Sequence, residues 1–235
     1  DELFDVTPHA VELTSRLIVL GDSWLLPRKF KVAFSNSAAD NAFATANDVG
    51  FIAARHGNRR GFRVFVAGGM GRSPQPGQLL HEFIVEDEVF LVVEAVKRLF
   101  SRLGNRRNKH TARLRFLWNT LGQPRFIEEY QNQRRMLEAE HPAHFVPPAW
   151  SDTGRMPSGL TPADADSPDF DLWERRYVTA QRQTGLSSIF VPLSLGDISS
   201  EKAMLLADAL APFGDHILRC TADQNFVLRN IPNQY

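Results

Sequence analysis

The chain has 235 residues, of which 27 are Lys or Arg and 27 are Asp or Glu, so its formal net charge is zero. Its length suits one large domain or two ordinary ones, and 43% hydrophobic residues suffice for a core. The charge balance argues against a general polyanion binder, and no apolar run approaches the roughly 20 residues of a membrane span. We therefore expect neither nucleic acid nor membrane as a partner.

The sequence begins at Asp1 with neither Met nor a signal-peptide pattern, which indicates a processed chain or a piece of a longer one. Cys220 is the single cysteine, so the chain cannot form an internal disulfide, a Cys-based zinc site or a Cys-ligated iron–sulfur cluster. A lone cysteine is compatible with a reducing, cytoplasmic compartment. Its alternation with Leu218 predicts a thiol packed in the core. The seven histidines form no zinc-protease motif, and we expect no metal ligands.

Hydrophobic periodicity predicts β-strands followed by a run of helices in a first block, residues 1–140. Thr7-Pro8 is typical of a helix start, and Gly57-Asn58 indicates a turn between two antiparallel strands. A loop rich in Pro and Gln follows the third strand. The expected elements are a helix over 8–19, strands over 28–35, 49–54 and 62–67, and helices over 86–103, 108–121 and from 124 onward.

The composition changes after residue 140. Six prolines between 142 and 168 predict a linker or extended crossover over 141–172. A smaller block, 173–235, follows, with a strand, a helix and a strand pair expected over 188–193, 200–213, 217–220 and 225–229. This β-α-β-β order is half of a ferredoxin-like sandwich, whose open face should have a partner. The fold class is therefore α+β.

Three features could carry chemistry. Lys29 and Lys31 would lie on one strand face about 7 Å apart, either as a solvated surface or as an anion-binding pair. The glycine turn, residues 67–71, allows close backbone approach to an anionic ligand but is equally consistent with an ordinary tight turn. A basic run would form a solvated helix surface or a patch for a partner, and comprises Lys97, Arg98, Arg102, Arg106, Arg107, Lys109, Arg113 and Arg115.

Several motifs together resemble the sirohaem-dependent nitrite and sulfite reductases. They cover nearly the whole chain except the Pro-rich segment. The combination of LPRKFK with AND at this spacing is the part of the pattern that is specific to the family. The motifs are LPRKFK at 26–31, AND at 46–48, Gly61-Phe62 before the glycine turn, Glu94-Ala95-Val96, Gly104-Asn105-Arg106, and R-C-T-A-D-Q-N at 219–225 with Ile231-Pro232.

The resemblance implies an enzyme of two pseudo-symmetric halves that carries sirohaem and a [4Fe–4S] cluster. Residues 1–140 would be the first sirohaem-cradling module, with a mixed sheet and helices, and 173–235 the second ferredoxin-like half. Lys29 and Lys31 would be the catalytic residues that bind the substrate anion. The implied cofactor-binding residues are Arg28, Asn47, Gly68, Gly69, Gly71, Arg219 and Asn225.

The implied reaction is the six-electron reduction of sulfite to sulfide, with electrons from ferredoxin or a flavoprotein. Nitrite-specific relatives tend to have Asn where this chain has Lys31, so Lys31 favours sulfite, and reduction of nitrite to ammonia is the alternative. A further alternative is a non-catalytic module that binds an anion or a partner. The four cluster cysteines would lie beyond Tyr235. We therefore expect this piece to bind neither cofactor and to be inactive by itself.

Overall fold

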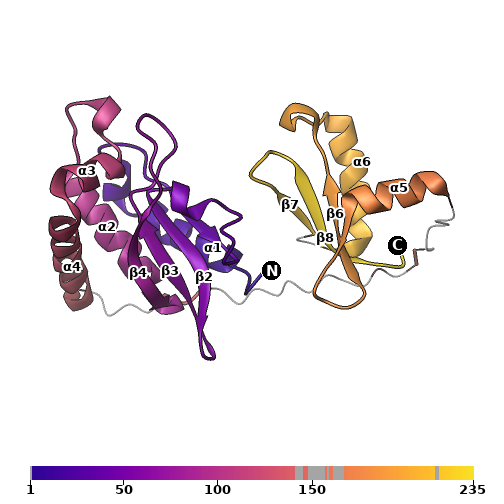
Figure 1. Ribbon diagram of the computed structural model, residues 1–235, viewed down its shortest axis with the longest axis horizontal. Coiled ribbons are helices and arrows are strands. Elements are labelled where there is room, and N and C mark those ends of the chain that lie inside the picture. Colours follow the sequence, from indigo (N-terminus) through magenta and orange to yellow (C-terminus); the bar gives the residue numbers. More distant parts are fainter. Residues whose placement is uncertain (1, 141–144, 148–156, 158, 161–166, 215–216) are drawn as a thin grey trace. The chain divides into compact units, whose positions relative to one another are not determined.

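A computed structural model describes residues 2–140, 145–147, 157, 159–160, 167–214 and 217–235. The chain divides into two compact units, Asp1–Trp150 and Ser151–Tyr235, and each is described by itself (Figure 1). The predicted α+β class is confirmed, with one sheet in each unit. Among the described residues, no helix combines the length and apolar character that a membrane crossing requires.

The first unit contains a four-stranded mixed sheet whose spatial order follows the chain, β1-β2-β3-β4. β1 pairs with β2 in parallel, with Val32 opposite Val49, and the other two pairings are antiparallel. The predicted antiparallel pair is confirmed, and Gly57 in its turn has φ +61°, which favours glycine. The strands are β1 (Val32–Ser35), β2 (Val49–His56), β3 (Arg59–Val66) and β4 (Gln78–Val85).

Figure 1 shows α2, α3 and α4 gathered on one side of this sheet. Apolar residues along α2 recur at helical spacing and are fully buried, among them Val92, Val96 and Leu99. Gly104 ends α2, and Gly122 separates the next two helices. The helices of this unit are α1 (Thr7–Ile18), α2 (Val89–Leu103), α3 (Leu114–Leu121) and α4 (Gln123–Glu140).

Aromatic side chains between the sheet and α1 enclose a histidine. Phe34 stacks on Phe51 at 4.8 Å between ring centroids, and Phe4 meets Phe62 edge to face at 5.5 Å. His9 is 2% exposed among these rings, and its Nε2 lies 3.1 Å from Glu86 Oε1. Burial lowers the pKa of His9, because the charged imidazolium loses its hydration, although Glu86 opposes this shift.

The first unit differs from the sequence expectations in three places, two of them wrong bounds and one an unpredicted strand. The strand expected over 28–35 begins only at Val32, so the two lysines precede it. The helix expected over 108–121 is split into a short turn, Lys109–Thr111, and α3, because the Asn108 side chain accepts the His110 N–H and caps the turn. The Pro- and Gln-rich loop leads into β4, whose pairing with β3 outweighs its weak sequence pattern.

The second unit contains an antiparallel sheet in the order β5-β6-β8-β7. The predicted β-α-β-β order is present from β6 onward, and β5 is an additional edge strand. Ser167 and Ser199 cap two helices with their hydroxyl groups. The elements are α5 (Pro168–Tyr177), β5 (Val178–Ala180), β6 (Leu186–Val191), α6 (Ser200–Leu210), β7 (Leu218–Cys220) and β8 (Phe226–Pro232).

The linker predicted over 141–172 overlaps the start of α5, because Ser167-Pro168 supplies a helix cap and a first-turn proline. Most of the remaining linker lies outside the described residues. Cys220 is exposed, which contradicts the expected core thiol. It is the last residue of a three-residue strand, and the small core lies elsewhere, around Ile217, Leu228 and Ile231.

We expect the stability of the first unit to fall on acidification below about pH 6.5, the ordinary pKa of histidine. The pKa of His9 is lowered in the folded state, so the unfolded chain takes up this proton first as the pH falls. His9→Phe should therefore reduce the slope of Tm against pH between about pH 7.5 and 5.5. Thermal unfolding of the 235-residue chain at several pH values measures this slope.

Phe4→Leu is the matched packing control for this prediction. It should lower Tm at every pH and keep the full slope, because it removes packing from the same cluster but no titrating group. Burial also lowers the pKa of His81, so some slope remains in His9→Phe. An unchanged slope in His9→Phe would contradict the assignment.

Candidate functional site

Residues 29–31, here called the KFK segment, immediately precede β1. Lys29 and Lys31 are exposed, and Phe30 between them stacks on Phe100 at 6.0 Å between ring centroids. Within the described part of the chain, neither lysine side chain pairs with a carboxylate. Two neighbouring cations are thus left available to an external anion.

The backbone of the KFK segment is fixed at its downstream end by Asp48, which is fully buried. Asp48 Oδ2 accepts the Lys31 N–H at 2.8 Å and also accepts from Arg113 Nη2 at 2.7 Å. The Lys31 carbonyl accepts the Val49 N–H at 3.1 Å, which starts the parallel pairing of β1 and β2. Burial raises the pKa of Asp48, and the Arg113 guanidinium opposes that shift.

The glycine turn is bonded to the same short stretch of chain. The Asp48 carbonyl accepts the Ala67 N–H at 2.9 Å, and the Asn47 carbonyl accepts the Gly68 N–H at 2.9 Å. A Cβ at Gly68 would lie 2.1 Å from the Thr45 carbonyl oxygen, so no larger residue fits there. Residues 47 and 48 therefore tie the glycine turn and the KFK segment together.

Arg115 lies under the glycine turn and is 4% exposed. Its Nη2 donates to the Arg72 carbonyl at 2.6 Å, and a Cβ at Gly69 would lie 2.6 Å from Nη1. Its buried Nε has no hydrogen-bond partner among the described residues. The prediction that the basic run is a solvated surface is therefore wrong for Arg115, and also for Lys97, which is 1% exposed.

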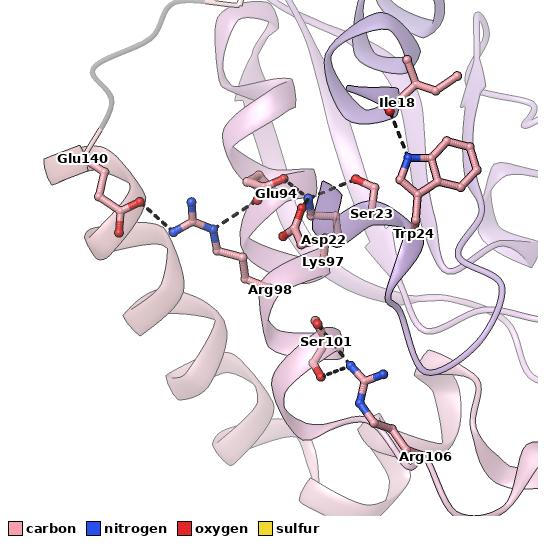
Figure 2. A network of polar contacts seen from close by, with 10 residues as sticks. All are labelled: Ile18, Asp22, Ser23, Trp24, Glu94, Lys97, Arg98, Ser101, Arg106 and Glu140. Carbon is pink, nitrogen blue, oxygen red and sulfur yellow. Dashed lines mark hydrogen bonds and ion pairs between the residues drawn. The ribbon is translucent and has the colours of Figure 1, made fainter. Parts of the chain in front are cut away.

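Figure 2 shows how Lys97 anchors the chain upstream of the KFK segment. Its Nζ donates to Asp22 Oδ1 at 2.7 Å and to Ser23 Oγ at 3.2 Å, and lies 2.9 Å from Glu94 Oε2. Glu94 also pairs with Arg98. The short turn Gly21–Trp24 is thereby held against α2 by a buried charge.

Two further contacts position the residues just before the KFK segment. Arg106 Nη1 donates to the Leu25 carbonyl at 2.8 Å. Its Nη2 donates to the Ser101 carbonyl at 2.8 Å (Figure 2). A Cβ at Gly104 would lie 2.6 Å from Pro27 Cγ, so the end of α2 packs directly on Pro27. The KFK segment is thus fixed on both sides while its charged side chains stay exposed.

A cavity of about 600 Å³ lies between α1 and residues 23–34. Arg28 and Lys29 line it together with apolar side chains, among them Leu13 and Phe30. Trp24 stands at this cavity, 71% exposed, and its Nε1 donates to the Ile18 carbonyl at 3.1 Å (Figure 2). The KFK segment therefore has a partly open apolar surface beside it.

The structure brings together the predicted site residues of the first unit only in part. Lys31, Asn47 and the glycine turn share one hydrogen-bond network, whereas the exposed Arg28 lines the cavity. The Asn47 side chain donates to the Phe43 carbonyl at 2.8 Å, so its amide is used within its own loop. Sequence reasoning did not single out Asp48, Arg113 or Arg115 as site residues.

Arg219 and Asn225 belong to the second unit. Arg219 is half-buried on β7, and its Nη1 donates to the Leu218 carbonyl at 3.1 Å. Asn225 closes the turn between β7 and β8, because its Oδ1 accepts the Leu193 N–H at 2.7 Å and its Nδ2 donates to Asp223. The geometry thus gives Asn225 a structural task in that turn.

The fold is α+β, and its first unit carries two exposed lysines just before β1. Residues 1–136 match the family described as the nitrite and sulphite reductase 4Fe-4S domain. Residues 179–235 match the nitrite/sulfite reductase ferredoxin-like half domain. The chain belongs to the nitrite and sulfite reductase family.

Proteins similar to this chain include both sulfite reductases and nitrite reductases. A sulfite reductase [ferredoxin] 1 of Mycolicibacterium paratuberculosis is 28% identical over 99% of this chain and 38% of its own length. A chloroplastic ferredoxin–nitrite reductase of Oryza sativa subsp. japonica is 26% identical over 89% of the chain and 32% of its length. The structure of the Mycobacterium tuberculosis NirA protein matches with a TM-score of 0.71 and 29% identity, over 99% of this chain and 38% of that one.

We expect Gly68→Ala to destabilise the first unit by about 3 kcal/mol, since its Cβ would meet backbone atoms that cannot move away. Gly71→Ala is the control, because the atom nearest to its Cβ, among the described residues, is Arg115 Nη2 at 3.4 Å. That variant should change the free energy of unfolding by less than about 0.5 kcal/mol. Denaturant unfolding of the two variants measures the difference. Equal losses of unfolding free energy would contradict the close packing of the turn on residues 45 and 47.

We expect Lys97→Met to cost about 3 kcal/mol of unfolding free energy, because Glu94, with its side chain 4% exposed, loses a cationic partner. Adding Glu94→Gln should recover part of that loss, because it replaces the buried carboxylate that has lost its cationic partner with a neutral amide. A double-mutant cycle in denaturant measures both effects. Additive losses in the double variant would show that the two side chains are not coupled.

Proposed function

We propose that the chain is the part of a sulfite-reducing enzyme that binds the substrate anion, with Lys29 and Lys31 as the binding and catalytic residues. The observation that carries this proposal is the contrast between their side chains and their backbone. The ammonium groups are exposed and have no carboxylate partner among the described residues, whereas the backbone is anchored on both sides. Cations that have no carboxylate partner and stand on an anchored backbone suit an oxyanion site.

The two lysines would act on the substrate in three ways. They hold the oxyanion by charge-assisted hydrogen bonds, which are about twice as strong as neutral ones. They offset negative charge that accumulates during reduction, and they donate protons or hydrogen bonds toward departing oxygen atoms. Anchoring of the backbone matters because the same charges on a mobile loop would lose entropy on binding.

Sirohaem is the cofactor implied by the resemblance, and when bound it would supply the redox chemistry. Its carboxylates require cationic and N–H partners, and the first unit offers such groups. We propose that Arg28, Asn47 and the backbone of Gly68, Gly69 and Gly71 in the first unit contact the macrocycle. The unpartnered Nε of Arg115 behind the glycine turn fits this assignment. Arg219 and Asn225 are proposed as cofactor-binding residues on the resemblance alone.

The residues present do not fit a [4Fe–4S] cluster. One cysteine cannot supply four thiolate ligands, and the described residues contain no cluster of three or more His, Cys, Asp or Glu that could hold a metal. The chain spans 38% of the length of the sulfite reductase relative. The activity therefore belongs to the complete protein, and we expect this piece to be inactive by itself.

Sulfite is the proposed substrate because Lys31, the second lysine of the KFK segment, stands where nitrite-specific relatives tend to have Asn, and nitrite is the alternative. The relatives are named for both substrates and for ferredoxin, so ferredoxin is the proposed electron donor, with a flavoprotein as the alternative. A reducing, cytoplasmic location is proposed on the single cysteine alone. A non-catalytic module that binds an anion or a partner remains the contrasting hypothesis.

We expect Lys29→Ala combined with Lys31→Ala in the complete protein to reduce sulfite turnover at least about a hundredfold. The absorption spectrum of the bound haem should stay largely unchanged, because the substitutions remove substrate contacts and leave the fold in place. Steady-state turnover with sulfite and with nitrite, at equal haem content, gives the result. A higher kcat/KM for nitrite than for sulfite in the unchanged protein would select the alternative substrate.

Lys202→Ala is the matched control, since Lys202 is an exposed lysine on α6 in the second unit. It should leave both turnover and spectrum unchanged. If the double lysine variant reduces sulfite as well as this control does, the two lysines are only a solvated surface. The non-catalytic hypothesis would then be favoured if the complete protein also lacks activity.

A further inference from the structure

We propose that Asp48 is the positioning residue of the anion site, and that its carboxylate, held by Arg113, sets where Lys31 stands relative to the glycine turn. This inference rests on the proposed function of the lysines. Asp48 touches neither substrate nor cofactor in this proposal. It acts only through the backbone of its neighbours.

Asp48 reaches three parts of the chain that are distant in sequence. Its Oδ2 accepts the Lys31 N–H at 2.8 Å, and its backbone carbonyl accepts the Ala67 N–H at 2.9 Å. Its two carboxylate oxygens accept from Arg113, Oδ2 from Nη2 at 2.7 Å and Oδ1 from Nε at 3.3 Å. The KFK segment and the start of α3 therefore meet at the Asp48 side chain, and the glycine turn is bonded to the backbone of the same residue.

Full burial makes this connection depend on charge. A carboxylate at 0% exposure is stable only with hydrogen bonds and a counter-ion, which the Lys31 N–H and Arg113 supply. Loss of the negative charge would weaken both bonds, because charge-assisted hydrogen bonds are stronger than neutral ones. It would also leave the Arg113 guanidinium, 22% exposed, without its counter-ion.

The expected consequence is a loss of anion affinity with the chemistry retained. When Lys31 N–H is released, the KFK segment keeps its upstream anchors at Lys97 and Arg106 but gains freedom at its downstream end. A displacement of about 1 Å at a binding group is enough to cost up to a hundredfold in a rate or affinity. The lysine side chains themselves are still present to act on any anion that does bind.

The first test is hydrogen exchange of the Lys31 amide, which needs no turnover. Asp48→Asn and Arg113→Lys in the complete protein should increase the exchange rate of this amide at least about tenfold. Arg113→Lys keeps the positive charge but removes the two-pronged contact, so it should give the smaller increase. It also serves as the decisive variant if Asp48→Asn fails to fold.

The second test is kinetic. Both variants should raise KM for sulfite, about tenfold for Asp48→Asn, while kcat stays within about threefold. The dissociation constant from sulfite titration of the haem spectrum should rise in parallel. A purely structural role would lower Tm without separating KM from kcat.

Arg134→Lys is the matched control for Arg113→Lys. Arg134 is 21% exposed, and its carboxylate partners are Glu88 and Glu138, neither of which contacts Asp48 or Lys31 in the described hydrogen bonds. It should lower Tm to a similar extent and leave both KM and the exchange of the Lys31 amide unchanged. A rise in KM for this control equal to that of Arg113→Lys would overturn the proposal.

The outcomes separate this inference from the proposed function. If the double lysine substitution abolishes turnover but Asp48→Asn changes neither Lys31 exchange nor KM, Asp48 has no positioning role and the function stands. If the exchange rate rises but KM does not, the hydrogen bond exists without functional effect, and the inference is wrong. If the lysine substitution itself leaves turnover unchanged, the proposed function fails and this inference fails with it.

Discussion

The geometry of the first unit depends on the hydrogen bonds of the buried Asp48 carboxylate. An ionised group without solvent must be neutralised and hydrogen-bonded, and Arg113 together with the Lys31 N–H meets that requirement. The backbone carbonyls of residues 47 and 48 also accept N–H groups of the glycine turn. Residues 47–48 therefore connect the KFK segment, the glycine turn and the start of α3. Because a buried charge without these partners would be costly, one arrangement of the three segments is specified.

Five basic side chains of this unit illustrate two opposite tasks. Lys97, Arg113 and Arg115 are buried or half-buried and hold chain segments together. Lys29 and Lys31 are exposed and, within the described residues, unpaired. Net charge conceals this division, since the chain as a whole is neutral. What decides the role of each cation is whether a carboxylate or carbonyl lies within reach.

The sequence predicted the elements with strong periodicity, such as α1, α2 and the pair β2–β3, together with the α+β class. It failed where long-range contacts decide: β4 exists because β3 pairs with it, and β1 starts late because Asp48 takes the Lys31 N–H. Local pattern located the KFK segment and the glycine turn. It could not assign Arg113 and Arg115, because helical spacing says nothing about a partner more than 40 residues away.

The order of strands in the first sheet has a consequence for how this unit folds. Because β1, β2, β3 and β4 are neighbours in both sequence and space, the sheet closes only short loops, and such pairings form fast. The Asp48–Arg113 and Asp22–Lys97 contacts instead join residues 65 and 75 positions apart, which carries a larger loop-closure entropy. We therefore expect the contacts that fix the lysine-bearing edge to form after the sheet, when α2 and α3 dock.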